Sequence, residues 1–82
     1  MRVMVTIHFE SSRLTEMAPL LPAEQRHVAE MHEQGKLESI YISADRVTVW
    51  VVMKGETLEQ VQQDMAAFPL YPYMRTEFIP LL

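Results

Sequence analysis

Apolar and polar residues alternate along the first ten positions of the chain. Over residues 2–9 they form two sets, with Val3, Val5, Ile7 and Phe9 on one side and Met4, Thr6 and His8 on the other. A period of two residues is typical of a β-strand that buries one face. The pattern therefore predicts a strand over residues 2–9, followed by a polar loop at residues 10–13.

Two later segments carry helical signals. The first helix is expected to begin at about Pro19 or Pro22, because proline is tolerated at the first helical position, and to run to Gln34. Gly35 can then adopt the left-handed conformation that ends many helices. The second helix opens with a capping box at residues 57–60, and its apolar stripe consists of Leu58, Val61 and Met65.

Two strands, over residues 37–43 and 46–54, are predicted between the helices, with Ala44-Asp45 as a tight link. A last strand is expected at about residues 73–79. The order β-α-β-β-α-β is that of the ferredoxin-like fold, in the α+β class. A chain of 82 residues is expected to form one domain over residues 1–82.

The segment Val47–Met53 is apolar at nearly every position, which is typical of a strand buried on both faces. The helices of a ferredoxin-like unit cover only one face of its sheet. We therefore expect a second subunit to cover the other face, giving a dimeric α/β barrel. The alternative is a monomer with an exposed apolar surface.

Charge and composition exclude several classes of protein. The net charge is −4 with only seven Lys and Arg, so no basic face for nucleic acid is expected. The absence of cysteine excludes disulfides and thiolate metal sites. We expect neither a membrane-spanning segment nor a signal peptide, and hence a cytoplasmic protein without a membrane partner.

Glu24 is the leading candidate for catalysis. It lies within an apolar stripe that, if the helix extends that far, consists of Met17, Leu21, Val28 and Met31. A carboxylate in such a stripe must be neutralised, paired or presented to a cavity, and burial would raise its pKa into the range useful for acid–base chemistry. The alternative is a structural role, since a negative charge in the first turn of a helix is favourable.

The histidines are weaker candidates for catalysis or metal binding. His8 could shuttle a proton or orient a substrate from the second face of the first strand, or it could simply be solvated. His27 and His32 are five positions apart, so a helix turns them away from each other and surface positions are the better interpretation. We predict no metal site.

A rigid aromatic corner is predicted where the second helix meets the last strand. It contains Pro69 and Pro72, and proline cannot lie inside a helix or a central strand. The hydroxyls of Tyr71 and Tyr73 could reach a pocket or a subunit boundary.

The corner Phe68-Pro69-Leu70-Tyr71-Pro72-Tyr73-Met74 resembles the Leu-Phe-Pro-Tyr-Met corner of the muconolactone delta-isomerase family. The resemblance extends from Leu21 to Met74 almost without gaps and includes Ala23-Glu24 and Glu33-Gln34-Gly35. It implies dimeric α/β barrels that assemble into decamers and move a proton within an unsaturated lactone in aromatic catabolism, without a cofactor.

The resemblance implies that Glu24 transfers the proton, with His8 or Tyr73 assisting, and that a small-molecule lactone is the ligand. The expected substrate-binding residues are Thr6, Val47, Val49, Tyr71 and Tyr73. Val47 and Val49 stand where the family carries a tyrosine and an asparagine, so the pocket is expected to be more apolar. A non-catalytic module that binds a small apolar ligand, or serves in assembly, is therefore the alternative. An RNA-binding domain is disfavoured by the charge, and a small monooxygenase by the absence of a cofactor motif.

Overall fold

A four-stranded sheet forms one layer of the structure, a computed structural model that describes residues 1–82. Its strands lie in the order β2-β3-β1-β4, and all neighbours are antiparallel. The strands are β1 (Arg2–Phe9), β2 (Leu37–Ile42), β3 (Thr48–Lys54) and β4 (Met74–Leu81). The predicted element order and α+β, ferredoxin-like class are confirmed.

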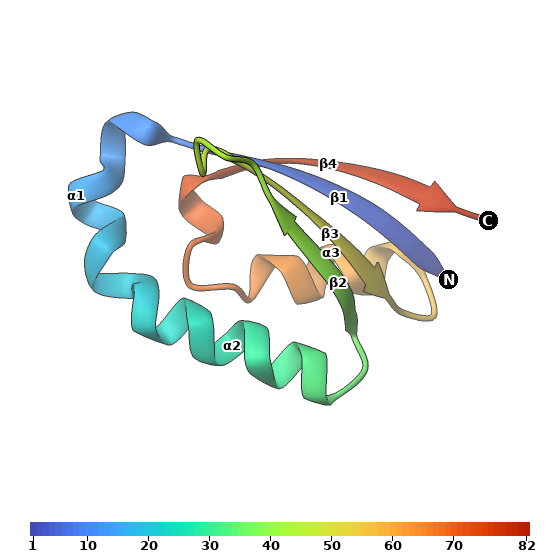
Figure 1. The fold of residues 1–82 in the computed structure, drawn as a ribbon. Coiled ribbons are helices and arrows are strands. Elements are labelled where there is room, and N and C mark those ends of the chain that lie inside the picture. Colours follow the sequence, from blue (N-terminus) through green and yellow to red (C-terminus); the bar gives the residue numbers. More distant parts are fainter.

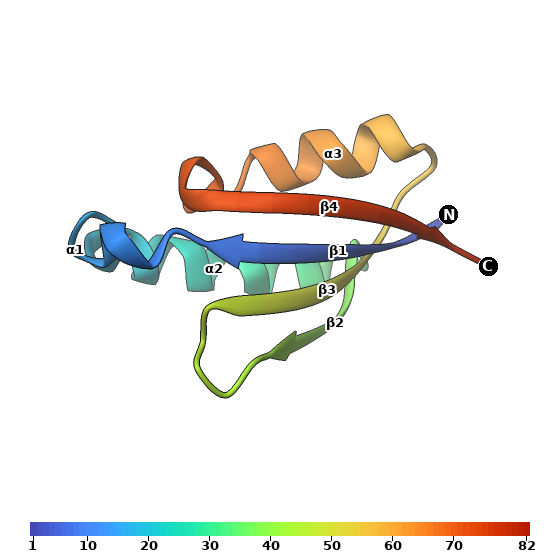
Figure 2. The same cartoon turned by 90° about the horizontal axis from the view of Figure 1, so that it is seen from above.

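Helices form the second layer. The two longer ones, α2 (Leu21–Glu33) and α3 (Leu58–Ala66), lie on the same face of the sheet, as Figures 1 and 2 show. A short helix α1 (Leu14–Met17) lies between single 3₁₀ turns at Ser11–Arg13 and Ala18–Leu20. Another 3₁₀ turn, Tyr71–Tyr73, leads into β4. No helix is both long and apolar enough to span a membrane.

The core lies between the apolar face of β1 and the two longer helices. Val3 and Val5 are fully buried, and the antiparallel register places Val51 of β3 opposite Val5. Val61 and Met65 of α3 are also fully buried. The predicted start of α3 is confirmed, since the Thr57 side chain accepts a hydrogen bond from the Gln60 backbone at 3.1 Å. Burying this face against two helices stabilises the fold.

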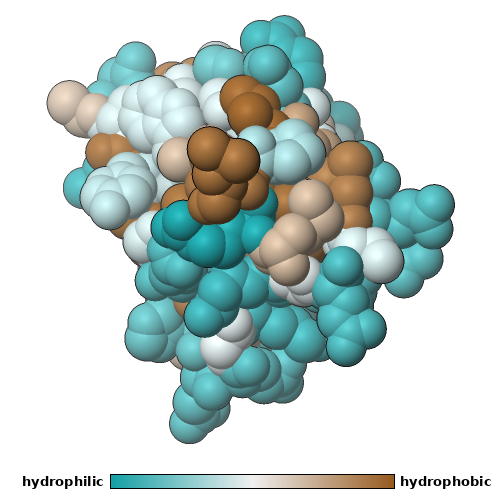
Figure 3. Space-filling model, turned by 90° about the vertical axis from the view of Figure 1, so that its right-hand side faces the viewer, coloured by the Kyte–Doolittle hydropathy of each residue, from teal (hydrophilic) through white to brown (hydrophobic).

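The second face of the sheet is covered by no element of the chain (Figures 1 and 2). Trp50 of β3 lies here and is 37% exposed, while its neighbour Val52 is buried. Polar residues of β1 and β4 share this face, among them Thr6 and Glu77, which lie opposite each other. The face is therefore mixed rather than uniformly apolar. Figure 3 shows similar mixing of apolar and polar groups at the end of the molecule where both termini lie.

Some boundaries differ from the prediction. Residues 11–20, expected to be partly a polar loop, form short helical turns, and Pro19 lies in one of them. The helix α2 begins at Leu21, with Pro22 at its second position. The last strand begins at Met74 and continues to Leu81, two residues beyond the predicted end. Single helical turns have no apolar period, so the pattern could not reveal them.

Candidate functional site

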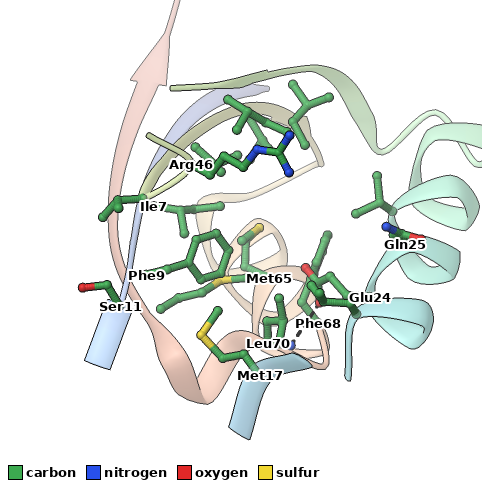
Figure 4. Close-up of a pocket in the computed structure, with 18 of the residues that line it drawn as sticks. Ile7, Phe9, Ser11, Met17, Glu24, Gln25, Arg46, Met65, Phe68 and Leu70 are labelled. Carbon is green, nitrogen blue, oxygen red and sulfur yellow. Dashed lines mark hydrogen bonds between the residues drawn. The ribbon is translucent and has the colours of Figure 1, made fainter. Parts of the chain in front are cut away.

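A cavity of about 690 Å³ lies between the sheet and the segment that contains α1 and α2. Of its 21 lining residues, 16 are hydrophobic. They include Val49 and Val51 of β3, and Phe68 and Leu70 of the aromatic corner. Figure 4 shows lining side chains from several elements, among them Ile7, Met65 and Phe68, around the cavity. An apolar cavity of this size with few polar groups is typical of a small-molecule site.

Glu24 presents its carboxylate to this cavity. The residue lies in the first turn of α2 and is half-buried. Its Oε1 atom accepts a hydrogen bond from the backbone N–H of Leu70 at 3.0 Å, drawn as a dashed line in Figure 4. The corner therefore supplies a fixed donor that orients the carboxylate, because Leu70 itself is buried.

Burial raises the pKa of Glu24 above its ordinary value of 4.5. Desolvation is the larger effect, because it disfavours the charged form. The Leu70 N–H and the nearby His27 act in the opposite direction and lower the pKa. A carboxylate with a raised pKa is a stronger base than an ordinary one, which suits it to remove a proton from carbon.

The raised pKa predicts that Glu24→Gln stabilises the fold at neutral pH. The folded chain holds a proton at Glu24 more readily than the unfolded chain, so stability falls as the pH rises through the window above 4.5. Glutamine avoids this cost and can still accept the Leu70 hydrogen bond. We expect the melting temperature at pH 7 to rise by on the order of a few degrees.

Thermal unfolding measured at pH 7 and below about pH 4 checks this prediction, since both states of the wild type are protonated at the lower pH and the difference should vanish. Glu33→Gln, at an exposed position of the same helix, is the matched control. A melting temperature of Glu24→Gln below that of the wild type at pH 7 would contradict the prediction.

Four further polar residues line the cavity: Ser11, Gln25, Asp45 and Arg46. Asp45 is engaged in its own turn, where one carboxylate oxygen accepts from the Ser43 hydroxyl at 2.6 Å and from the Val47 N–H at 3.0 Å. These contacts hold the pKa of Asp45 below its ordinary value. The hydrogen-bond donors left for a ligand are thus Ser11, Gln25 and Arg46.

His27 is more enclosed than a surface histidine. Its side chain is 19% exposed and packs edge-on against Phe68, with ring centroids 4.5 Å apart. Its Nδ1 atom lies 3.9 Å from Glu30, while Nε2 is buried without a hydrogen-bond partner. The expected surface position is therefore wrong for His27, because α2 turns it toward the corner; His32 is exposed.

The structure brings together three of the predicted site residues, Glu24, Val47 and Val49, around the cavity. Thr6 and His8 lie on the opposite face of the sheet, because successive residues of a strand point to opposite sides. On that face, the Nδ1 atom of His8 lies 3.2 Å from the Thr48 hydroxyl oxygen. Their part in catalysis or binding stays a prediction, without support from this cavity.

The two tyrosines of the corner are not among the cavity-lining residues. Tyr71 packs against the hydrophobic core. The Arg13 guanidinium lies over the Tyr73 ring, with its Cζ atom 4.5 Å from the ring centroid. Their contribution to substrate binding likewise stays a prediction.

Sequence reasoning missed three features of the site: the Leu70 N–H, Gln25 and Arg46. The Leu70 contact joins residues 46 positions apart, so no local pattern could reveal it. Gln25 directly follows Glu24, and Arg46 directly follows the predicted link Ala44-Asp45. The signal available for Arg46 was Asp45, a residue type that favours turns, directly before it. No three His, Asp or Glu side chains gather closely enough to hold a metal ion.

No curated protein matches the sequence. Among solved structures, the chain is similar to 5-chloro-2-hydroxyhydroquinone dehydrochlorinase (TftG) from Burkholderia phenoliruptrix AC1100, in complex with 2,5-dihydroxybenzoquinone. The TM-score is 0.82 at 11% identity, over 100% of this chain and 94% of the other, which shows a shared fold. The model of the family described as muconolactone delta-isomerase matches residues 1–82. The chain therefore belongs to the muconolactone delta-isomerase family.

Proposed function

We propose that this protein catalyses a proton shift within a small unsaturated lactone, with Glu24 as the general acid–base. The observation that carries the proposal is the position of the Glu24 carboxylate, facing an apolar cavity and fixed by the Leu70 N–H. Family membership supports the reaction class. The conversion of muconolactone to the 3-oxoadipate enol-lactone, a step of aromatic catabolism, is the reaction to test.

Such a shift needs one base that works at two carbons. The carboxylate of Glu24 would remove the proton from the ring carbon γ to the lactone carbonyl, and the electrons of that bond would move to the carbonyl oxygen as a dienolate. The Glu24 acid would then return the proton to the α carbon. Atoms and electrons balance without an external oxidant or reductant.

The dienolate also needs stabilisation of its oxygen, which general electrostatic arguments make a large part of catalysis. Gln25, next to Glu24 at the cavity, carries an amide N–H₂ that can donate to this oxygen. An apolar lining lowers the local dielectric constant and so strengthens charge interactions inside the cavity.

Turnover of muconolactone by the purified protein, followed in the ultraviolet, tests the proposal. We expect conversion well above that of a heat-denatured sample. Absence of conversion would reject the lactone isomerase function for this substrate.

The alternative function is that of a module that binds a small apolar ligand without reaction. Val47 and Val49 favour it, because they place apolar groups at the cavity where the resemblance implies polar ones. Binding of muconolactone without conversion in the same samples would support this alternative.

We also propose that a second copy of the chain covers the free face of the sheet, giving a homodimer that can assemble further, up to a decamer. Tyr41, Trp50 and Ile79 support this, since each exposes more than a third of its surface there. Light scattering coupled to size-exclusion chromatography should give a mass of at least twice 9.6 kDa. A mass of one chain at micromolar concentration would exclude the dimer.

A further inference from the structure

Arg46 adopts a backbone conformation that does not suit an arginine. Its φ angle is +64°, in the left-handed region, and it is the one residue other than glycine with a positive φ. Glycine and asparagine tolerate this region far better than a long side chain does. The turn requires it nonetheless, since the Arg46 N–H donates to the Ser43 carbonyl at 2.9 Å and the chain then enters β3. An arginine held in this unfavourable conformation points to a use for its side chain.

The side chain of Arg46 lines the cavity and has no partner within the chain. The four ion pairs of the protein use Arg2, Arg13, His27 and Lys36 as their cations. Figure 4 shows the Arg46 side chain reaching over the cavity from the side opposite Glu24. Its guanidinium therefore keeps its donors available for a ligand.

The other two charges at the cavity are negative. Asp45 directs one oxygen into the turn, toward Ser43 and Val47, and Glu24 lies across the cavity. An anionic ligand would be repelled by both carboxylates unless a cation held it. Arg46 is the single cationic side chain among the lining residues.

We propose that Arg46 is a specificity-determining residue that binds the carboxylate of the substrate. The ligand class is a small, flat and mainly apolar molecule with one carboxylate, held at Arg46, so that its body fills the cavity and its reacting carbon faces Glu24. A guanidinium binds a carboxylate through two parallel hydrogen bonds, which fixes orientation as well as charge. This inference rests on the proposed function and deepens it.

Calorimetric titration with two probes tests the inference. Muconolactone carries the carboxylate, and its methyl ester has the same body without the charge. Both are titrated into the Glu24→Gln variant, which is expected to convert the lactone about 10²–10⁴-fold more slowly than the wild type. We expect the acid to bind at least tenfold more tightly than the ester, and its affinity to weaken as salt is added.

Two substitutions on this background separate folding from binding. Arg46→Asn suits the left-handed backbone, so we expect its melting temperature to be no lower than that of its parent. Its affinity for the acid should fall by about tenfold to a hundredfold, while that for the ester stays unchanged. Arg46→Lys should restore part of the loss because it keeps the charge.

Arg26→Gln is the matched control, since Arg26 is an exposed arginine of α2 outside the cavity lining. It should leave both affinities unchanged. Equal loss of acid and ester in Arg46→Asn, no loss of acid, or no binding of the acid at millimolar concentration would each overturn the inference. Turnover by the wild type with unchanged acid binding in Arg46→Asn would overturn it and leave the proposed function intact.

Discussion

Exchange of Glu24 for glutamine is expected to lower kcat for muconolactone by about 10²–10⁴-fold, the usual contribution of a positioned general acid–base. Glutamine has nearly the same shape and keeps the acceptor for the Leu70 N–H, so the cavity should stay intact. It cannot take up a proton at any working pH. Steady-state kinetics followed in the ultraviolet measure the change in kcat.

In the wild type, kcat/KM should fall as the pH drops through the raised pKa of Glu24, because the carboxylate is the active form. The residual rate of Glu24→Gln should lack this acidic limb. The control Glu33→Gln should keep both the rate and the limb. A Glu24→Gln variant that retains more than about a tenth of the wild-type kcat would mean that another group carries the proton.

The second large effect is expected from Phe68→Ala, which should lower the free energy of unfolding by about 3–5 kcal/mol. Phe68 is only 4% exposed, belongs to the core cluster and packs edge-on against His27. Its removal would leave a void between α2, α3 and the corner. Because small domains have a total stability of about 5–15 kcal/mol, this loss is a large fraction of it.

Equilibrium unfolding in urea at pH 7 measures the loss. Phe78→Ala is the matched control: the same group is removed from a half-buried position in β4, so a smaller loss is expected. If Phe68→Ala cost no more than Phe78→Ala, the corner would contribute less to the core than its burial indicates.

Much of the fold could be predicted because its signals are local. The alternation in β1 placed Val3 and Val5 on the buried face of the strand, where the structure has them. The capping box at Thr57 located the start of α3. The aromatic corner was also recognisable, since its two prolines must interrupt both a helix and a strand. The short turns at residues 11–20 were missed because they have neither a period nor a cap of this kind.

The site could be predicted only in part, for a related reason. Glu24 was evident because a carboxylate in an apolar stripe conflicts with its surroundings. The donor that orients it, the Leu70 N–H, depends on a contact 46 positions away along the chain. The orientation of Arg46 follows from a positive φ in a hairpin turn, which the residue type argues against. Long-range contacts and unfavoured backbone conformations are the features that a pattern of residue types does not encode.

Proton removal from the lactone by Glu24 is the central step of the proposed mechanism, and proton nuclear magnetic resonance of muconolactone in D₂O observes it directly. We expect the wild type to change the ring C–H signals of the lactone, by conversion or by deuterium exchange, much faster than buffer alone. The Glu24→Gln variant should change these signals at least about a hundredfold more slowly than the wild type. Unchanged signals with the wild type, or equal rates with both proteins, would contradict the assignment of Glu24 as the acid–base.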